Sequence, residues 1–372
     1  MKKILIVVGA RPNFVKVACF KKAAKELNVN LAIEIVHTGQ HYDDKLSTIF
    51  FEQLEFFPDH FLNIEPSSAN IQIANIMIKL EELISKTKPD LIIVVGDVNS
   101  TLAAALTANK LGIKLAHVES GLRSWDKTMP EEINRILADK ISNFHFVTEQ
   151  SGIDNLEAEG HKLNESVYFV GNTMIDTLVR FEKQIEQSQI LDKFNISSKK
   201  YVLFTMHRPS NVDNEDGLKK LIHLMNEISK EFAVVFPIHP RTLNNLEKFN
   251  LKHLLDANKG IKLAEPLDYF SFQKLIKESY CVITDSGGVQ EETSFQQIPC
   301  ITLRQTTERP VTLIHGSNEL LPFEITTITD VVFNSKFKKG NSIPLWDGKA
   351  SHRILQRLIT YLLPKEELVL NT

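Results

Sequence analysis

The sequence is poor in cysteine and lacks the cysteine spacings that build zinc or redox sites. Only three cysteines occur among 372 residues, none of them in a CxxC pair, and Cys281 and Cys300 lie within apolar runs. Such cysteines are typically reduced core residues of a cytoplasmic protein. His207, His239 and Asp285 could hold a metal only in principle, because no ligand spacing supports it, and no metal site is predicted.

Long apolar runs and an excess of either charge are also absent. No apolar run approaches the length that spans a bilayer. The N-terminal stretch MKKILIVVGARPN begins like a signal peptide, but its apolar run is too short and no small-residue cleavage site follows it. The net charge is −3 with both signs mixed along the chain, which disfavours nucleic-acid binding. Neither a membrane nor a nucleic acid is therefore expected as a partner.

Two common nucleotide-binding glycine motifs are missing as well. The chain contains neither GxGxxG nor GxxxxGK[ST]. Their absence argues against a standard dinucleotide site and against a P-loop.

The sequence does contain a regular alternation of apolar runs of strand length with segments of helical period. Residues 3–9, 89–97 and 114–120 are typical of buried strands. Near-continuous apolar strands indicate a parallel sheet covered on both faces.

The alternation pauses between Gly171 and Lys200 and then begins again. We therefore predict an α/β protein of two Rossmann-like domains with parallel sheets facing a central cleft. The N-terminal domain is expected to span residues 1–172 and the C-terminal domain residues 173–349. A last helix, about residues 350–372, is expected to pack back on the first domain.

Polar residues gather just after the predicted strands. In open parallel sheets the ligand crevice lies beyond the carboxyl ends of the strands, so several polar exits together predict a binding cleft. These exits are GARPNFVK, HTGQHYD, GDVNST, VESGLRS, TMHRPSN, PIHPR and TDSGG.

The motif DSGGVQEE begins at one such exit. Ser286, Gly287 and Gly288 can point successive backbone N–H groups at an anion where a helix starts. Glu292, one turn into that helix, could accept hydrogen bonds from a ribose diol. A tight strand–helix turn with an acidic first turn accounts for the same residues without a ligand.

The first domain adds two cations at the exit of its first strand. Arg11 is placed to bind a diphosphate with its bidentate fork, and Lys16 follows on the same helix. The alternative is a pair of surface cations.

Three carboxylates of the first domain are candidates for acid–base chemistry. Asp97 and Glu119 end buried runs, and Glu131 opens a helix with Arg135 one turn later. Burial at a strand exit is costly for a carboxylate unless it is paired, and it can raise the pKa toward that of a general acid or base. Capping is the alternative for Asp97 and Glu119, and a surface Glu131–Arg135 ion pair is the alternative for the third.

In the second domain, His207 ends a strand and is the best candidate histidine, whereas His239 and Arg241 form a weaker set. Phe272 lies either in the core or against a nucleobase. Arg309 follows another strand, in a ligand site or in a salt-bridged loop.

These motifs in this order resemble those of one family. In sequence order they are RPNFVK, HTGQHYD, GDVNST, HVESGLRS, MPEEINR, VGNTMID, HRPSNVD, HPR, DSGGVQEE and TTERP. The chain resembles the non-hydrolysing UDP-N-acetylglucosamine 2-epimerase family, whose fold is the two-domain GT-B arrangement with a nucleotide-sugar cleft.

The resemblance implies an isomerase that acts on UDP-N-acetylglucosamine (UDP-GlcNAc) without a cofactor or metal. UDP is eliminated across C1–C2 to give 2-acetamidoglucal, and it adds back after C2 is reprotonated on its opposite face, which gives UDP-N-acetylmannosamine (UDP-ManNAc). The catalytic residues implied are Asp97, Glu119, Glu131 and His207. The substrate-binding residues implied are Arg11, Lys16, Arg135, Phe272, Ser286, Gly287, Gly288, Glu292 and Arg309. The family also suggests a homodimer, binding of UDP, and a place in cell-surface polysaccharide biosynthesis.

The chain departs from the family's pattern at two places. Pro209 and Ser210 stand where substrate-regulated bacterial members often carry arginine and glutamate, and Asp43 replaces a glutamine of some members. These departures argue against the usual activation by substrate. The candidates for the second, allosteric site are Gln40, His41, His239 and Arg241.

Four other functions would use a similar UDP site. They are the same chemistry on a modified UDP-2-acetamido sugar, a hydrolysing epimerase that releases ManNAc and UDP, a GT-B glycosyltransferase, and a UDP-sugar sensor without turnover. The carboxylates at the strand exits favour an epimerase.

Overall fold

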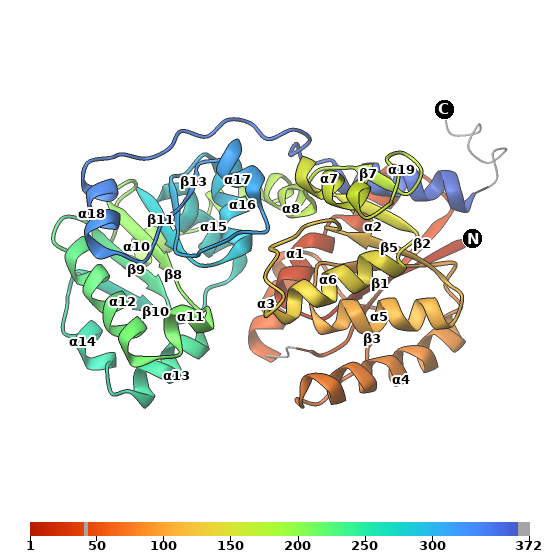
Figure 1. The fold of residues 1–372 in the computed structure, drawn as a ribbon, viewed down its shortest axis with the longest axis horizontal. Coiled ribbons are helices and arrows are strands. Elements are labelled where there is room, and N and C mark those ends of the chain that lie inside the picture. Colours follow the sequence, from red (N-terminus) through yellow and green to blue (C-terminus); the bar gives the residue numbers. More distant parts are fainter. Residues whose placement is uncertain (41–43, 364–372) are drawn as a thin grey trace. The chain divides into compact units, whose positions relative to one another are not determined.

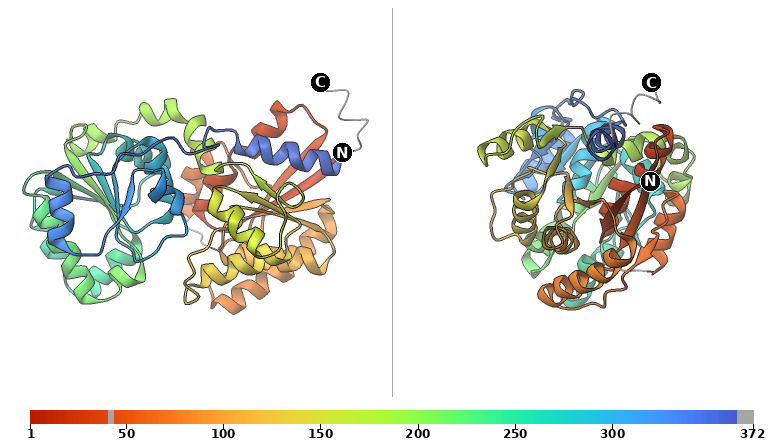
Figure 2. Two further views of the ribbon diagram at one scale, coloured as in Figure 1. Left: turned by 45° about the horizontal axis from the view of Figure 1, so that its top comes forward. Right: turned by 90° about the vertical axis from the view of Figure 1, so that its right-hand side faces the viewer.

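The computed structural model describes residues 1–40 and 44–363. The chain divides into two compact units, which Figure 1 shows in ribbon form. The first unit comprises Met1–Arg180 and the segment that starts at Pro344, and the second comprises Phe181–Ile343. Each unit is an α/β layer structure with helices on both faces of its sheet (Figure 2).

The first unit contains a seven-stranded parallel sheet in the order β3-β2-β1-β4-β5-β6-β7. Its strands are β1 (Lys2–Val8), β2 (Leu31–His37), β3 (His60–Phe61), β4 (Leu91–Val95), β5 (Lys114–Val118), β6 (Phe144–Val147) and β7 (Val167–Phe169). The central strands β1 and β4 pair with Ile4 opposite Leu91. All of β4 is buried, as expected for a strand covered on both faces.

The helices of the first unit are α1 (Arg11–Val17), α2 (Phe20–Glu26), α3 (Asp44–Gln53), α4 (Ala69–Thr87), α5 (Asn99–Lys110), α6 (Pro130–Ile141), α7 (Gln150–Ala158), α8 (Thr173–Arg180) and α19 (Ala350–Leu362). Helix α4 buries Gln72, Ile76, Leu80 and Ile84, which lie one turn apart on one face. Helix α5 packs beside it through small buried alanines, so that these two helices cover one face of the sheet.

The second unit contains a six-stranded parallel sheet in the order β10-β9-β8-β11-β12-β13. Its strands are β8 (Tyr201–Thr205), β9 (Ala233–Pro237), β10 (Ile261–Ala264), β11 (Cys281–Thr284), β12 (Cys300–Thr302) and β13 (Asn318–Leu320). Its helices are α9 (Glu182–Glu186), α10 (Ile190–Phe194), α11 (Pro209–Val212), α12 (Glu215–Ile228), α13 (Pro240–Lys248), α14 (Lys252–Asp256), α15 (Tyr269–Glu278), α16 (Gly287–Gln296), α17 (Pro310–Ile314) and α18 (Ile325–Phe333).

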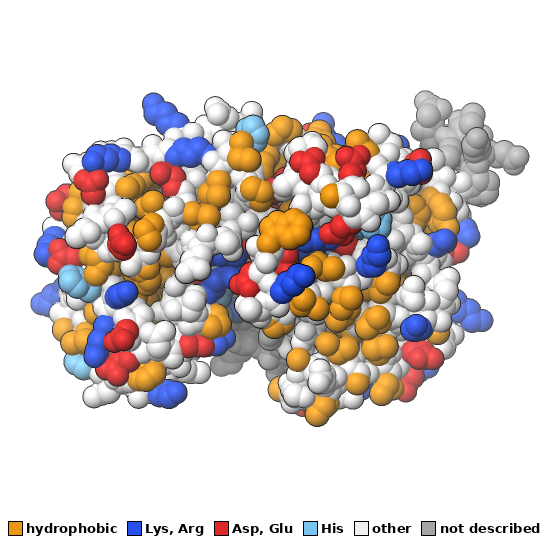
Figure 3. All heavy atoms as spheres, in the orientation of Figure 1, with side chains coloured by type: hydrophobic (Ala, Val, Ile, Leu, Met, Phe, Trp, Pro, Cys, Tyr) orange, Lys and Arg blue, Asp and Glu red, His pale blue; other side chains and the backbone are white. Residues whose placement is uncertain are grey.

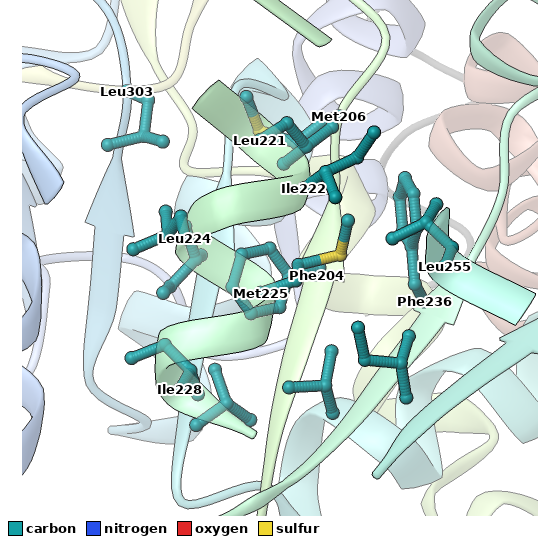
Figure 4. Close-up of a cluster of buried hydrophobic side chains, with 14 of the residues drawn as sticks. Phe204, Met206, Leu221, Ile222, Leu224, Met225, Ile228, Phe236, Leu255 and Leu303 are labelled. Atoms are coloured by element: carbon teal, nitrogen blue, oxygen red, sulfur yellow. The ribbon is translucent and has the colours of Figure 1, made fainter. Parts of the chain in front are cut away.

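The core of the second unit lies between β8, β9 and the apolar face of α12. Figure 4 shows Phe204 and Phe236 of the strands against Leu221 and Met225 of the helix. All four side chains are fully buried. This packing fixes the positions of β8 and β11, and therefore the positions of their carboxyl ends.

The boundary between the two units lies at Arg180, eight residues beyond the expected boundary at residue 172. Helix α8 packs on α1 and α19 of the first unit, which explains the difference. The buried carboxylate of Asp176 in α8 accepts the backbone N–H groups of Ala350 and Ser351, at 2.9 and 2.6 Å, where α19 begins. The return of the chain to the first unit at Pro344 likewise precedes the expected residue 350.

The described helices include none that combines the length and the apolar character of a membrane span. On the face seen in Figure 3, acidic and basic side chains are interspersed over each unit. This distribution accords with the mixed charges of the sequence.

Candidate functional site

Helix α1 begins at the exit of β1 and ties this exit to that of β4. The side-chain oxygen of Asn13 accepts hydrogen bonds from the backbone N–H groups of Gly9 and Ala10, both at 3.1 Å, and its Nδ2 donates to the carbonyl of Val95 at 3.2 Å. Asn13 is buried, and these bonds satisfy its amide. Arg11, the half-buried first residue of α1, is thereby held beside the first strand exit.

Lys16 and Glu119 form a buried ion pair between α1 and the exit of β5. Glu119 adopts a φ of +68°, and Gly96 at the exit of β4 adopts a φ of +66°. A β-carbon on Gly96 would lie 3.4 Å from Lys16 Nζ and 3.6 Å from Glu119 Oε2, so glycine lets the backbone approach the pair. A left-handed non-glycine residue is strained, and such residues concentrate at functional sites.

Asp97 at the exit of β4 is bound to helix α6. Its Oδ2 pairs with Nη2 of Arg135, whose Nη1 contacts Glu132 Oε2 at 2.5 Å. A surface pair of Glu131 with Arg135 is therefore the wrong interpretation, because Arg135 is buried and faces Asp97 and Glu132. Glu131 itself is exposed in the first turn of α6. The sequence reasoning missed Glu132, although its spacing of three residues from Arg135 could have indicated it.

A largely buried charge network lies under these exits and was also missed. His117 of β5 lies 2.6 Å from Asp139 through Nδ1 and 2.8 Å from the carbonyl of Gly96 through Nε2. Asp139 also accepts from Arg123 at 2.7 Å, and Arg123 binds Glu159 through two hydrogen bonds. Burial raises the pKa of Asp139, but His117 and then Arg123 outweigh it and hold the pKa at about 2. This network fixes the carbonyl just before Asp97.

Gln40 joins the exit of β2 to the start of α5. Its Oε1 accepts from the backbone N–H of Ser100 at 2.9 Å and from its hydroxyl at 2.7 Å. The Ser100 hydroxyl also contacts that of Thr38 at 2.8 Å. His41, the second expected residue of this exit, lies outside the described residues.

In the second unit, Asp285 organises the exits of β8 and β11. Its carboxylate accepts the backbone N–H groups of His207, at 3.1 Å, and Arg208, at 2.9 Å, and the side-chain amide of Asn211 at 3.1 Å. His207 Nδ1 lies 3.0 Å from Asp285 Oδ1. Burial raises the pKa of Asp285, but His207, followed by Arg208 and Asn211, lowers it below its ordinary value.

His239 and Arg241 lie near His207 but have structural partners. The rings of His207 and His239 are 5.2 Å apart. His239 caps α13 by accepting the backbone N–H of Arg241, and Arg241 Nε pairs with Asp213 at 2.7 Å. Among the residues that the structure describes, no cluster of three or more His, Cys, Asp or Glu side chains could hold a metal ion.

At the start of α16, backbone N–H groups lie beside the guanidinium of Arg309, which is fixed by ion pairs. Ser286 is the N-cap residue, and a β-carbon on Gly287 would lie 2.8 Å from Nη1 of Arg309. Arg309 pairs with Glu291 at 2.7 Å and with Glu308, and all three side chains are buried. The salt bridge given as the alternative for Arg309 is therefore present. The guanidinium of Arg309 lies where α16 begins, next to the positive end of the helix dipole.

Glu292 lies one turn further along α16 and is only 6% exposed. Burial raises the pKa of Glu292 to about 8. A hydrogen bond with Gln273 opposes this rise, and the charge of Glu291 adds to it. Phe272 of α15 is partly buried and packs against the core cluster on this side of the sheet. Gly288 is the second residue of α16.

The sequence profile described as UDP-N-acetylglucosamine 2-epimerase matches residues 23–359. The chain belongs to this family. The UDP-N-acetylglucosamine 2-epimerase of Methanocaldococcus jannaschii is 40% identical over 368 residues, which cover 96% of this chain and 99% of the relative. The UDP-2,3-diacetamido-2,3-dideoxy-D-glucuronate 2-epimerase of Pseudomonas aeruginosa is 39% identical over 361 residues, with the same coverage of 96% and 99%.

A crystal structure of the Methanocaldococcus jannaschii UDP-GlcNAc 2-epimerase in complex with UDP-GlcNAc and UDP superposes with a TM-score of 0.88. It is 40% identical and covers 96% of this chain and 99% of that one. The fold is also similar to that of the lipopolysaccharide outer core galactosyltransferase WaaB, at 12% identity and a TM-score of 0.51. The two-sheet α/β architecture is thus GT-B-like, and the predictions of fold class and family are confirmed.

Proposed function

We propose that this protein is a non-hydrolysing UDP-GlcNAc 2-epimerase, which interconverts UDP-GlcNAc and UDP-ManNAc. The observation that carries the proposal is the pair of carboxylates, Asp97 and Glu119, at neighbouring strand exits, each with its own buried cation. They occur in a chain of the epimerase family that is 40% identical, over nearly its full length, to a relative crystallised with UDP-GlcNAc and UDP.

In the proposed reaction a base removes the proton from C2 of the sugar while the C1–O bond breaks. UDP leaves with the electron pair of that bond, and 2-acetamidoglucal remains. UDP then adds to C1 again as an acid delivers a proton to the opposite face of C2. The scheme involves no net oxidation or reduction, so it needs no nicotinamide cofactor, and the protein supplies acid, base and positioning.

The acid–base steps are assigned to Asp97, Glu119 and Glu131 as a set, with His207 as a further essential group. Each of the first two carboxylates faces a cation within the protein. In this assignment the primary role of Lys16 is its ion pair with Glu119, and that of Arg135 is its ion pair with Asp97.

The second unit is assigned to UDP. The N–H groups of Ser286, Gly287 and Gly288 at the start of α16, with Arg309 beside them, suit a diphosphate. Arg11 is assigned to the same diphosphate. Glu292, buried with a raised pKa, suits hydrogen bonding to the ribose diol, and Phe272 is assigned to the uracil.

The deciding experiment is proton NMR of UDP-GlcNAc incubated with the protein in heavy water without added cofactor. We expect UDP-ManNAc that carries deuterium at C2, with no accumulation of free sugar. Free ManNAc with UDP would show the hydrolysing reaction instead. An unchanged spectrum together with measurable UDP binding would contradict turnover of this substrate.

A modified substrate is the second candidate, because the Pseudomonas aeruginosa relative that acts on a diacetamido uronate is nearly as similar as the UDP-GlcNAc enzyme. The same incubation with a UDP-2,3-diacetamido uronate separates the two. We also propose a cytoplasmic homodimer, which sedimentation of the purified protein and fractionation of its source cells would test.

A further inference from the structure

Glu132, the neighbour of the exposed Glu131, connects two segments at the candidate acid–base site. It is only 1% exposed. Its carboxylate accepts the backbone N–H of Ser124 at 3.0 Å, the Ser124 hydroxyl at 2.9 Å and the backbone N–H of Trp125 at 3.0 Å. On its other side it contacts Nη1 of Arg135 at 2.5 Å. A buried carboxylate with this many donors is held in one orientation.

Arg135 connects the fixed carboxylate of Glu132 to the carboxylate of Asp97. Its second nitrogen, Nη2, pairs with Asp97 Oδ2, so that one rigid guanidinium joins the two carboxylates. The preceding Asn134 donates to the backbone carbonyl of Asp97 at 2.9 Å. Helix α6 therefore holds both the side chain and the backbone of Asp97, while part of that side chain stays exposed.

Trp125 is the other residue that Glu132 holds. Its φ is +61°, in the left-handed region that a bulky residue rarely adopts, and its side chain is 71% exposed. Such strain persists only where the surroundings over-determine it. Here the hydrogen bond from Trp125 N–H to Glu132 supplies part of that restraint.

We infer that Glu132 is a positioning residue for the epimerisation: through Arg135 it sets the orientation of the Asp97 carboxylate, and it fixes the loop of Ser124 and Trp125 on the same helix. The inference rests on the proposed function, because it takes Asp97 as an acid–base group. Glu131 and Glu132 then have separate tasks, the former toward the substrate and the latter toward the protein.

The test compares Glu132→Gln with Glu157→Gln, an exposed glutamate of α7, as the matched control. The amide keeps the shape of Glu132 but removes the charge that faces Arg135, so Arg135 and Asp97 lose their fixed geometry. We expect kcat about 100-fold lower, with KM and the Kd of UDP within about threefold of the wild type. The control should match the wild type in all three quantities.

Trp125 gives an independent readout, because the chain has only two tryptophans and Trp346 is buried, with its indole N–H bonded to the Thr148 carbonyl. Tryptophan emission anisotropy should fall in Glu132→Gln and stay unchanged in Glu157→Gln. Arg135→Lys should lower kcat as well, and the double variant should be no slower than the slower single variant, since both changes break the same connection.

Full activity of a folded Glu132→Gln protein, or additive losses in the double variant, would overturn the inference. If Glu132→Gln does not fold, Ser124→Ala takes its place, since it removes one donor and keeps the carboxylate. We expect about a tenfold loss of kcat in Ser124→Ala at unchanged KM, and wild-type kcat there would overturn the inference. A wild-type protein without turnover overturns the proposed function and the inference with it, whereas an active wild type with an active Glu132→Gln overturns the inference alone.

Discussion

Asp97 and Glu119 of the first unit and Glu292 of the second unit are held in opposite ways. In the first unit, Asp97 and Glu119 each face a buried cation, Arg135 and Lys16. In the second unit, Glu292 is buried with another glutamate as its charged neighbour, and the pKa of Glu292 rises to about 8. The first arrangement pairs each carboxylate with a cation, whereas the second favours the neutral form of Glu292.

This difference suits two different tasks. A carboxylate held in place by a cation can take up a proton and release it again, which epimerisation requires. A neutral glutamic acid can donate as well as accept a hydrogen bond, which suits an uncharged diol beside a diphosphate. The comparison therefore predicts that chemistry and UDP affinity can be damaged separately.

The largest expected effect is on turnover. Asp97→Asn should lower kcat about 1000-fold, because the amide cannot act as base or acid, while the Kd of UDP stays within about threefold of the wild type. Glu131→Gln should behave in the same way. NMR rates and titration calorimetry with UDP check the two quantities, with the exposed Asp256→Asn as a control. A loss of UDP affinity alone would contradict the assignment.

The opposite pattern is expected at Glu292. Glu292→Ala should weaken UDP binding by about 2–3 kcal/mol, because it leaves the ligand's polar groups without a partner in a buried site. Glu292→Gln should lose less, since the amide keeps a neutral donor and acceptor in the same place. Calorimetry with UDP measures both variants, and kcat at saturating substrate should change less than in Asp97→Asn. Equal losses in the two Glu292 variants would show that the charged form binds the ligand.

A smaller effect is expected at Gly287. The new β-carbon of Gly287→Ala would lie 2.8 Å from Arg309 Nη1 and from Glu308 Oε1, so the side chain of Arg309 must shift. We expect UDP binding to weaken about tenfold, with kcat nearly unchanged, because Asp97 and its partners belong to the other unit. Wild-type affinity for UDP in this variant would show that Arg309 does not contribute to binding.

The sequence predicted the two parallel sheets and the polar strand exits because apolar periodicity and local turn chemistry are visible in short windows. It did not predict the partners of the exit residues. The Lys16–Glu119 pair joins positions far apart in sequence, and the His117–Asp139 pair depends on how α6 packs on β5. The sequence also did not show that Glu131 is exposed and the adjacent Glu132 buried, since this difference depends on tertiary packing.

The exact position of the boundary between the units, at Arg180, is difficult to read from the sequence for a related reason. The helical pattern after Gly171 carries no local mark of the unit to which it belongs. Only the packing of α8 on α1 and the capping of α19 by Asp176 place it in the first unit. Ion-pair partners and domain membership are both long-range properties, which a single sequence encodes only weakly.

A separate effect, on folding stability and not on turnover or binding, is expected to depend on pH. Because the folded pKa of Glu292 is about 8 and its ordinary value is 4.5, the folded protein keeps a proton between these pH values that the unfolded chain has lost. Stability from this group is therefore present below about pH 4.5 and is lost as the pH rises toward 8, by up to about 1.4 kcal/mol per pH unit. Glu292→Gln cannot titrate, so its unfolding free energy minus that of the wild type should increase from about pH 5 to pH 8 and then level off. Denaturant unfolding of both proteins across this range measures the difference. Parallel curves would mean that Glu292 is already ionised in the folded protein, and the contrast between the two units would then disappear.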